Sequence, residues 1–325
     1  MMFARVIVSI VAIIVFCSDD AAAASTTNVF WYSAAGDSDQ IADARPAATG
    51  FYACCNRIEL DANYTVTSVG ASALTSYVAA AGGMPVVHTV SVDEHMLWGT
   101  ASTSGSGPTP STAADAIAGL VVASNARGAM IDYEVPAAIF KTWSATKVRA
   151  VANGYASWAT LLAEKLHALN ATLGLDLAGD DGGSPIDLFD VFAQNASAVD
   201  DLFLMSTYRD LHDSLAYEKV LVTRALAAGI APAKLGVGLG SVSAAFPTEF
   251  GWNASDLTAY LQWLAEKDIK SIGIWRSDID VHAPSVARTA PFFLDALRAF
   301  LGRRDDNITA LQAKLDAALG GRATD

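Results

Sequence analysis

Two carboxylic acids stand two positions apart at the end of an apolar stretch of the chain, Asp132 and Glu134. Side chains on a β-strand alternate between two faces, so these acids share a face with Met130, while Ile131 and Tyr133 occupy the other face. When two carboxylates are buried close together, the pKa of one of them rises. The stretch is therefore typical of a site that holds and delivers a proton.

Acidic and aromatic residues also accompany the ends of other predicted strands. One strand runs into Asp176, another ends at Tyr208, and a third ends at Trp275 and is followed closely by Asp278. Sugar rings stack on indole groups, and sugar hydroxyls hydrogen-bond to carboxylates. If the ends of these strands meet, the residues around them favour a carbohydrate site.

Short apolar runs alternate along the chain with segments of helical length, a pattern that predicts parallel strands linked by helices. Eight such units in about 270 residues predict a closed (β/α)8 TIM barrel, in which active sites form at the C-terminal ends of the strands. An open doubly wound sheet is the alternative. The predicted strands are Val29–Ser33, Gly50–Cys55, Pro85–Val90, Gly128–Glu134, Leu173–Ala178, Leu202–Tyr208, Leu235–Leu239 and Ser271–Trp275.

Amphipathic periodicity and capping residues predict the helices. Ser111, ahead of Asp115, and Asn253, ahead of Asp256, are typical of helix starts. One predicted helix has a continuous apolar face formed by Tyr155, Trp158, Leu161, Leu162 and Leu166. The predicted helices lie near Val66–Ala81, Ser111–Asn125, Gly154–Leu169, Ile186–Ser197, Ser214–Ala228, Ser255–Lys267 and Ser285–Leu301.

The N-terminus has the pattern of a secretory signal. Arg5 precedes an apolar run from Val6 to Phe16, and small residues follow at Ala21–Ala24. We expect a signal peptide over residues 1–24, a single barrel domain over 25–302, and a C-terminal helix and tail over 303–325; an uncleaved signal anchor is the alternative. No later run reaches about 18 apolar residues, so we expect a secreted or lumenal protein without stable membrane insertion after cleavage.

Five of the nine asparagines stand in Asn-X-Ser/Thr sequons, which also supports entry into the secretory pathway. Ser and Thr are too infrequent for chance to produce more than roughly two sequons among these asparagines. We therefore expect a eukaryotic secretory protein with N-linked glycans on its surface. The candidate acceptors are Asn63, Asn170, Asn195, Asn253 and Asn307.

Charge and cysteine content narrow the possible partners. A net charge of −13 argues against nucleic acid and anionic membranes as partners. The adjacent pair Cys54 and Cys55 is interpreted as small core residues on a strand, with a strained vicinal disulfide or a metal site as alternatives. The run Asp93-Glu94-His95 matches no specific metal-ligand spacing, so we expect neither a metal nor a cofactor.

Four segments of the sequence, including the one that contains Asp132 and Glu134, resemble glycoside hydrolase family 18, the chitinase family. Its signature, D-G-x-D-x-D-x-E followed by proline, matches Gly128–Pro136 at the glycine, the last aspartate, the glutamate and the proline. Residues Asp201–Tyr208 are similar to the family's sixth strand, Lys234–Gly238 to its seventh, and Ile274–Asp278 to its eighth.

The sequence also departs from the family pattern at definite positions. Arg127 and Met130 replace the first two aspartates of the signature, and Arg209 stands where the sixth strand normally has an acid. The large α+β insertion of many family chitinases is absent. This absence favours a shallow, open groove suited to short oligosaccharides or glycan chains.

The resemblance implies a retaining, substrate-assisted glycosidase that cleaves β-1,4-linked N-acetylglucosamine. Glu134 would be the general acid, Asp132 would orient the acetamido group of the substrate, and Tyr208 would hydrogen-bond the acetamido oxygen. Trp275 would stack under the sugar ring. The other predicted substrate-binding residues are Asp278 and Met130.

Three other interpretations remain open. A thioether cannot exchange a proton as a carboxylate does, so Met130 favours a weak or inactive enzyme that acts as a lectin-type sugar-binding protein. Glu134 could instead pair with Arg209 or Arg276 without any chemistry. The chain could also hydrolyse a sugar that lacks the acetamido group.

Overall fold

The computed structural model describes most of the chain outside its two termini, with gaps between many of the elements. Within that part, no helix is both long enough and apolar enough to span a bilayer. The predicted signal peptide, the helix predicted over Ile186–Ser197 and the tail after Gly302 lie outside the described residues. The described ranges are 27–34, 41, 45–60, 66–68, 71–92, 110–133, 142–178, 198–205, 215–241, 252–276 and 291–302.

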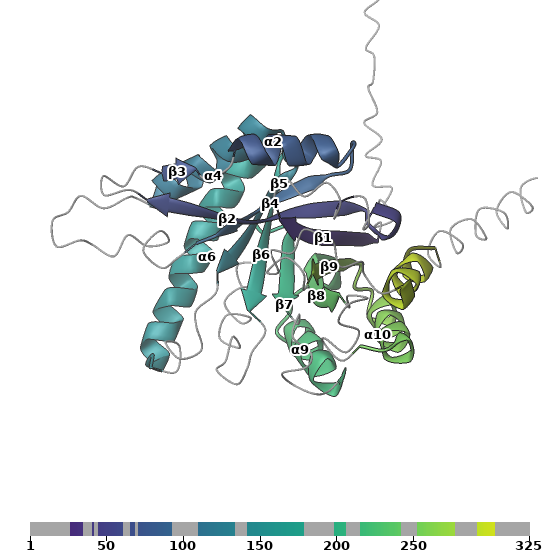
Figure 1. Cartoon of the computed structure of the whole chain (residues 1–325). Coiled ribbons are helices and arrows are strands. Elements are labelled where there is room, and N and C mark those ends of the chain that lie inside the picture. Colours follow the sequence, from purple (N-terminus) through teal and green to yellow (C-terminus); the bar gives the residue numbers. More distant parts are fainter. Residues whose placement is uncertain are drawn as a thin grey trace, which may run out of the picture.

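Eight parallel strands form a closed barrel at the centre of the molecule (Figure 1). Strand β1 closes the circle because it pairs in parallel with both β2 and β9. This closure confirms the predicted (β/α)8 barrel and excludes the open sheet, which would have two free edges. The strands are β1 (Asn28–Ala34), β2 (Gly50–Leu60), β4 (Val86–Ser91), β5 (Gly128–Tyr133), β6 (Thr172–Ala178), β7 (Asp201–Met205), β8 (Leu235–Ser241) and β9 (Ser271–Arg276).

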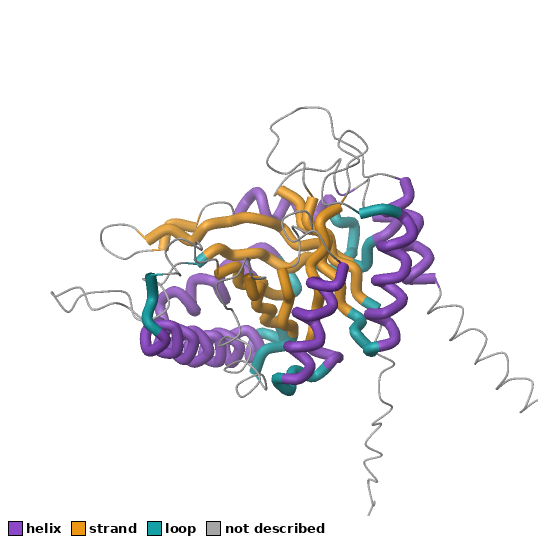
Figure 2. The backbone as a smooth tube through the Cα atoms, turned by 90° about the horizontal axis from the view of Figure 1, so that it is seen from below, coloured by secondary structure: helices purple, strands orange, loops and turns teal. Residues whose placement is uncertain are grey.

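Helices cover the outside of the barrel (Figure 2). The apolar face predicted from Tyr155, Trp158 and Leu166 is confirmed, since all three side chains are buried in the core between helix and strands. The helices are α2 (Ala71–Ala80), α4 (Pro110–Ser124), α6 (Ala145–Ala168), α9 (Leu215–Ala227), α10 (Ala254–Glu266) and a further helix over residues 291–302, with 3-10 turns η1 (Arg45–Ala47) and η2 (Pro232–Lys234).

Two predicted helix starts are wrong. Residues Val66–Ser68 form strand β3, which pairs antiparallel with β2, so α2 begins only at Ala71. Two of the three residues in β3 are β-branched, which suits a pleated strand. Helix α6 begins at Ala145 rather than at Gly154, because Ser144 caps it by accepting a hydrogen bond from a backbone N–H.

One of the two predicted caps is confirmed. Asn253 caps α10, and its side-chain oxygen accepts a hydrogen bond from the backbone N–H of Asp256 at 2.9 Å. Ser111 lies instead inside the first turn of α4, where its hydroxyl donates to Asp115 at 3.2 Å. Helix α4 starts at Pro110, whose missing N–H costs nothing at the first helical position.

The inward and outward faces of the barrel strands differ in composition. Outward side chains are largely aliphatic and share one core with the helices. The inward face holds aromatic rings, and glycines on neighbouring strands make room for them. A Cβ at Gly236 would lie 2.6 Å from the ring of Phe203, and a Cβ at Gly273 would lie 3.0 Å from it. The inward cluster comprises Tyr32, Tyr52, Val87, Met130 and Phe203.

Strand β2 is longer than its neighbours β1 and β4 and contains a bulge. Its register with β4 shifts between Ala53 and Asn56, so Cys54 and Cys55 lie at the irregularity. Their predicted position on a strand is confirmed. The side chains of both cysteines lie outside the described residues, and their burial and bonding state remain predictions.

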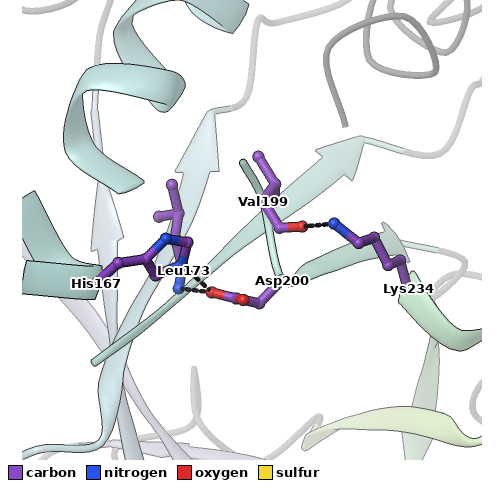
Figure 3. A network of polar contacts seen from close by, with 5 residues as sticks. All are labelled: His167, Leu173, Val199, Asp200 and Lys234. Carbon is purple, nitrogen blue, oxygen red and sulfur yellow. Dashed lines mark hydrogen bonds and ion pairs between the residues drawn. The ribbon is translucent and has the colours of Figure 1, made fainter. Parts of the chain in front are cut away.

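A polar network joins elements at the N-terminal end of the barrel (Figure 3). The Asp200 carboxylate accepts a hydrogen bond from the backbone N–H of Leu173 at 2.8 Å and lies 2.9 Å from Nε2 of His167. The Lys234 ammonium donates to the carbonyl of Val199 at 2.7 Å. Together these contacts hold α6, β6, the segment before β7, and η2 in a fixed arrangement.

Candidate active site

Strand register places Asp132 and Asp176 side by side. They are direct partners on β5 and β6, where parallel strands lie about 4.8 Å apart and paired side chains point to one face. That face is the inward one, because Met130, two residues before Asp132, belongs to the inward cluster. Ile131 and Tyr133 lie in the outer core, so the predicted alternation along β5 is confirmed.

Asp132 is held from both sides by neighbouring strands. Its partner on β4 is Ser91, whose hydroxyl donates to the Asp132 carboxylate at 3.3 Å. Its partner on β6 is Asp176. The Asp132 side chain is half-buried, whereas Asp176 is only 2% exposed. The more accessible acid of the pair is therefore the one that the sequence resemblance implies.

Asp176 is anchored by a tyrosine from the first strand of the barrel. The Tyr32 hydroxyl lies 2.8 Å from each oxygen of the Asp176 carboxylate. Burial, followed by the negative charge of Asp176, raises the pKa of Tyr32 well above its usual value of 10.0. Tyr32 therefore stays protonated and acts as a donor.

Sequence reasoning named Asp176 only as a residue at a strand end and did not single out Tyr32. Period-two alternation along a strand places each of them on a defined face, and this could be predicted from the sequence alone. Their contact could not be predicted in this way, because it joins residues 144 positions apart in the sequence across a closed barrel.

Met130 forms part of the floor beneath the two acids. Its side chain is 1% exposed and lies over Gly174, its partner on β6. A Cβ at Gly174 would come within 2.7 Å of the Met130 sulfur, so the thioether fills space that the glycine leaves. The position where the resemblance places a middle aspartate is thus occupied by apolar packing. Direct contact of Met130 with a substrate remains a prediction.

Trp275 lies at the C-terminal half of β9 and is half-buried. Its ring centroid is 5.7 Å from that of Tyr32, and the Tyr32 ring lies 4.4 Å from that of Tyr52. These contacts form an aromatic wall that runs from Trp275 into the barrel toward Asp176. A partly exposed indole beside inward acids fits the predicted stacking surface for a sugar ring.

Other predicted site residues lie outside the described residues. Glu134, Tyr208 and Asp278 belong to this group, and so do Arg209 and the Asp93–His95 run. Their roles stay predictions. Within the described ranges, no group of three or more His, Cys, Asp or Glu side chains could hold a metal ion.

Two of the five predicted glycan acceptors are described. Asn170 is exposed in the turn between α6 and β6, with a positive φ of 57° that asparagine tolerates better than most residues. Asn253 is exposed at the start of α10. Glycosylation at either residue stays a prediction, and Asn63, Asn195 and Asn307 lie outside the described residues.

Neither a protein-family model nor a curated protein matches the sequence. Solved structures do match. A chitinase from Chromobacterium violaceum aligns with a TM-score of 0.58 and 14% identity, over 85% of this chain and 99% of its own. The C-terminal domain of a putative chitinase from Desulfitobacterium hafniense aligns with a TM-score of 0.62, 14% identity and the same coverage.

An insect protein matches equally well. The Group IV chitinase of Ostrinia furnacalis aligns with a TM-score of 0.61 and 11% identity, over 85% of this chain and all of its own, 100%. The same enzyme in complex with allosamidin also matches, with a TM-score of 0.61. At these identities the likeness shows the fold. The chain has a (β/α)8 barrel with the fold of these chitinases.

Proposed function

We propose that this chain is a glycosidase that cleaves β-1,4-linked N-acetylglucosamine in chitin oligosaccharides or related glycans. The observation that carries the proposal is the position of Asp132. It lies on the inward face near the C-terminal end of β5, in a barrel with the fold of chitinases. In barrels of this kind the chemistry takes place at the C-terminal ends of the strands.

The proposed mechanism is substrate-assisted and retains the anomeric configuration. Glu134 donates a proton to the glycosidic oxygen as its bond to the anomeric carbon breaks. The acetamido oxygen of the same sugar attacks that carbon and forms a cyclic, positively charged intermediate. Water then opens the ring and returns a proton to Glu134. Asp132 stabilises the positive charge, and Tyr208 hydrogen-bonds the acetamido oxygen.

The surroundings of Asp132 suit this role. Apolar side chains such as Met130 form the floor below it, and charge interactions are stronger where water is excluded. A carboxylate held there by Ser91 stabilises a developing cation without having to reorient. Trp275 provides an aromatic surface on the same side of the barrel interior.

A chromogenic N-acetylchitooligosaccharide glycoside tests the proposal directly. We expect turnover by the wild type and a loss of roughly 100- to 10,000-fold in Glu134→Gln. Glu164→Gln, on the exposed face of α6, is the matched control and should leave the rate unchanged. Equal background rates in wild type and Glu134→Gln would contradict the proposal.

A sugar-binding protein without turnover is the second candidate function, and the buried thioether of Met130 favours it. It predicts that the wild type binds N-acetylglucosamine oligomers, as measured by calorimetry, but releases no chromophore. Binding of allosamidin, with which an insect neighbour was solved, provides a second probe. Turnover of glycosides that lack a 2-acetamido group would point instead to a hydrolase with a different mechanism.

We also propose that the chain enters the secretory pathway, is cleaved after residue 24 and carries N-linked glycans. The N-terminal pattern and the sequons support this, as does the exposure of Asn170 and Asn253. Expression in eukaryotic cells should yield secreted protein with a new N-terminus, and its gel mobility should increase after glycan removal. Retention of the uncleaved chain in the cell membrane would support a signal anchor.

A further inference from the structure

The geometry points to Asp132 and Asp176 as a pair that holds one proton, in which Asp176 is the positioning residue that takes over the proton when Asp132 must become charged. The catalytic part of this inference rests on the proposed function, whereas the sharing of the proton does not. The sequence resemblance does not assign Asp176, and Tyr32, which anchors it, is equally unassigned.

Adjacency is the first step. The two acids are direct register partners on β5 and β6 and point to the same inward face. Residues paired in this way have backbones about 4.8 Å apart, so their carboxylates are within reach of each other. Ser91 on β4 flanks Asp132, and Tyr32 on β1 reaches Asp176 from across the barrel.

The second step is electrostatic. The floor beneath the pair consists of Met130, Tyr52 and Phe203, and Asp176 itself is 2% exposed. Two negative charges this close in an apolar interior repel each other strongly, so one proton remains bound between them near neutral pH. The two acids then titrate as a pair rather than singly.

The third step decides which acid is charged. Tyr32 donates to the Asp176 carboxylate at 2.8 Å from both oxygens, whereas the hydroxyl of Ser91 lies 3.3 Å from Asp132. The shorter contact favours the anion on Asp176 in the resting protein. Asp132 then carries the proton and donates it to Asp176.

During the proposed reaction the proton moves within the pair. As the positively charged intermediate forms, the O–H bond of Asp132 breaks and an O–H bond forms on Asp176. The negative charge therefore moves from Asp176 to Asp132, next to the cation, and the total charge of the pair does not change. Met130 cannot accept this proton, so Asp176 replaces the acid that the signature has lost.

Other titratable groups lie near the pair, Tyr52 inside the barrel and Tyr155 outside it in the core under α6. Tyr52 on β2 and Tyr155 on α6 both stay neutral, because burial is the largest cause raising the pKa of each, followed by nearby acids. Asp201 on β7 is the register partner of Gly174, one layer below Asp176. A negative charge on Asp201 would disfavour a second charge in the pair. The described inward residues of β8 and β9 next to the floor, Gly236 and Gly273, carry no titratable group.

Carbon-13 NMR of side-chain carboxyls, on protein labelled at aspartate, tests the sharing without any need for turnover. Signals are assigned by their loss in Asp132→Asn and Asp176→Asn. We expect the Asp132 carboxyl to titrate above its usual pKa in the wild type and to shift back by at least one unit in Asp176→Asn. Asp201→Asn, the matched inward control, should shift it by much less. Titration of Asp132 at its usual pKa, unaffected by Asp176→Asn, would overturn the inference.

Turnover provides the second readout. Tyr32→Phe keeps the ring that packs on Tyr52 and Trp275 and removes only the hydroxyl. We expect both Asp176→Asn and Tyr32→Phe to lower kcat roughly tenfold or more, to shift the pH–rate profile, and to change KM little. Unchanged pH–rate profiles in both variants would contradict the catalytic part. Shared titration in a protein without turnover would confirm the pair while refuting the proposed function.

Discussion

The two ends of the barrel use the same residue type in opposite ways. At the N-terminal end, Asp200 accepts a hydrogen bond from a backbone N–H and contacts His167, which hold it in place. Toward the C-terminal end, hydroxyl groups of Ser91 and Tyr32 donate to Asp132 and Asp176. The backbone N–H of Leu173 fixes the position of Asp200, which gives that acid a structural role. Asp132 and Asp176 instead lie next to each other, so they can exchange a proton.

An aromatic layer separates these two regions. Tyr52, Phe203 and Met130 fill the barrel interior between them, and glycines on the neighbouring strands allow this dense packing. The layer keeps Asp132 and Asp176 in an apolar environment. It also separates them from the polar network at the N-terminal end of the barrel. The comparison therefore predicts that changes at one end affect activity and that changes at the other affect stability.

The largest expected effect is on catalysis at the C-terminal end of the barrel. Asp132→Asn should lower kcat/KM roughly 100- to 10,000-fold, because the amide cannot carry the charge that stabilises the intermediate. Its free energy of unfolding, measured by urea denaturation, should change little. A large loss of stability with unchanged specific activity would show that Asp132 is structural, as Asp200 is.

Next in size is a disturbance of the layer between the two ends. Gly236→Ala places a Cβ 2.6 Å from the Phe203 ring and should lower the free energy of unfolding by about 1–3 kcal/mol. Gly119→Ala is the matched control, because Gly119 lies exposed on α4 with nothing within 4 Å of an added Cβ. It should stabilise the protein by about 0.5–1 kcal/mol. Urea denaturation curves of both variants and of the wild type measure these changes in the free energy of unfolding.

A smaller effect on stability is expected at the N-terminal end of the barrel. Asp200→Ala removes the acceptor for the Leu173 N–H and the contact to His167, at a cost of about 1–2 kcal/mol in unfolding free energy. Specific activity on the chromogenic glycoside should stay within about twofold of the wild type. A drop in kcat comparable to that of Asp132→Asn would remove the functional distinction between the two ends.

The last expected effect concerns the pH dependence of stability. Burial and the neighbouring Asp200 raise the pKa of Asp201 to about 6 from 3.8, against a smaller opposing effect of Lys234. The folded state thus binds this proton more tightly than the unfolded chain does, so the resulting stabilisation is complete below about pH 4 and is lost as pH rises through 6. Unfolding free energies of wild type and Asp201→Asn should differ by about 2 kcal/mol more at pH 7 than at pH 4. Parallel curves would contradict the raised pKa.

Local patterns in the sequence were enough for most of the architecture. Alternating strands and helices predicted the closed barrel, and the apolar stripe through Trp158 predicted the packing of α6. The helix prediction failed at β3, because Val66–Ser68 is strand-forming only when β2 extends to pair with it. It failed also at the start of α6, although Ser144 and the buried Val148 and Val151 continue the same stripe.

By itself, the sequence determined which face of its strand Asp132 occupies, because side-chain alternation is a local property of a few consecutive residues. It also placed Met130 beside that acid. Only the tertiary structure decided that Asp176 lies next to Asp132 and that Tyr32 anchors Asp176. Those contacts depend on the register between strands and on closure of the barrel, which arise from the packing of the whole domain.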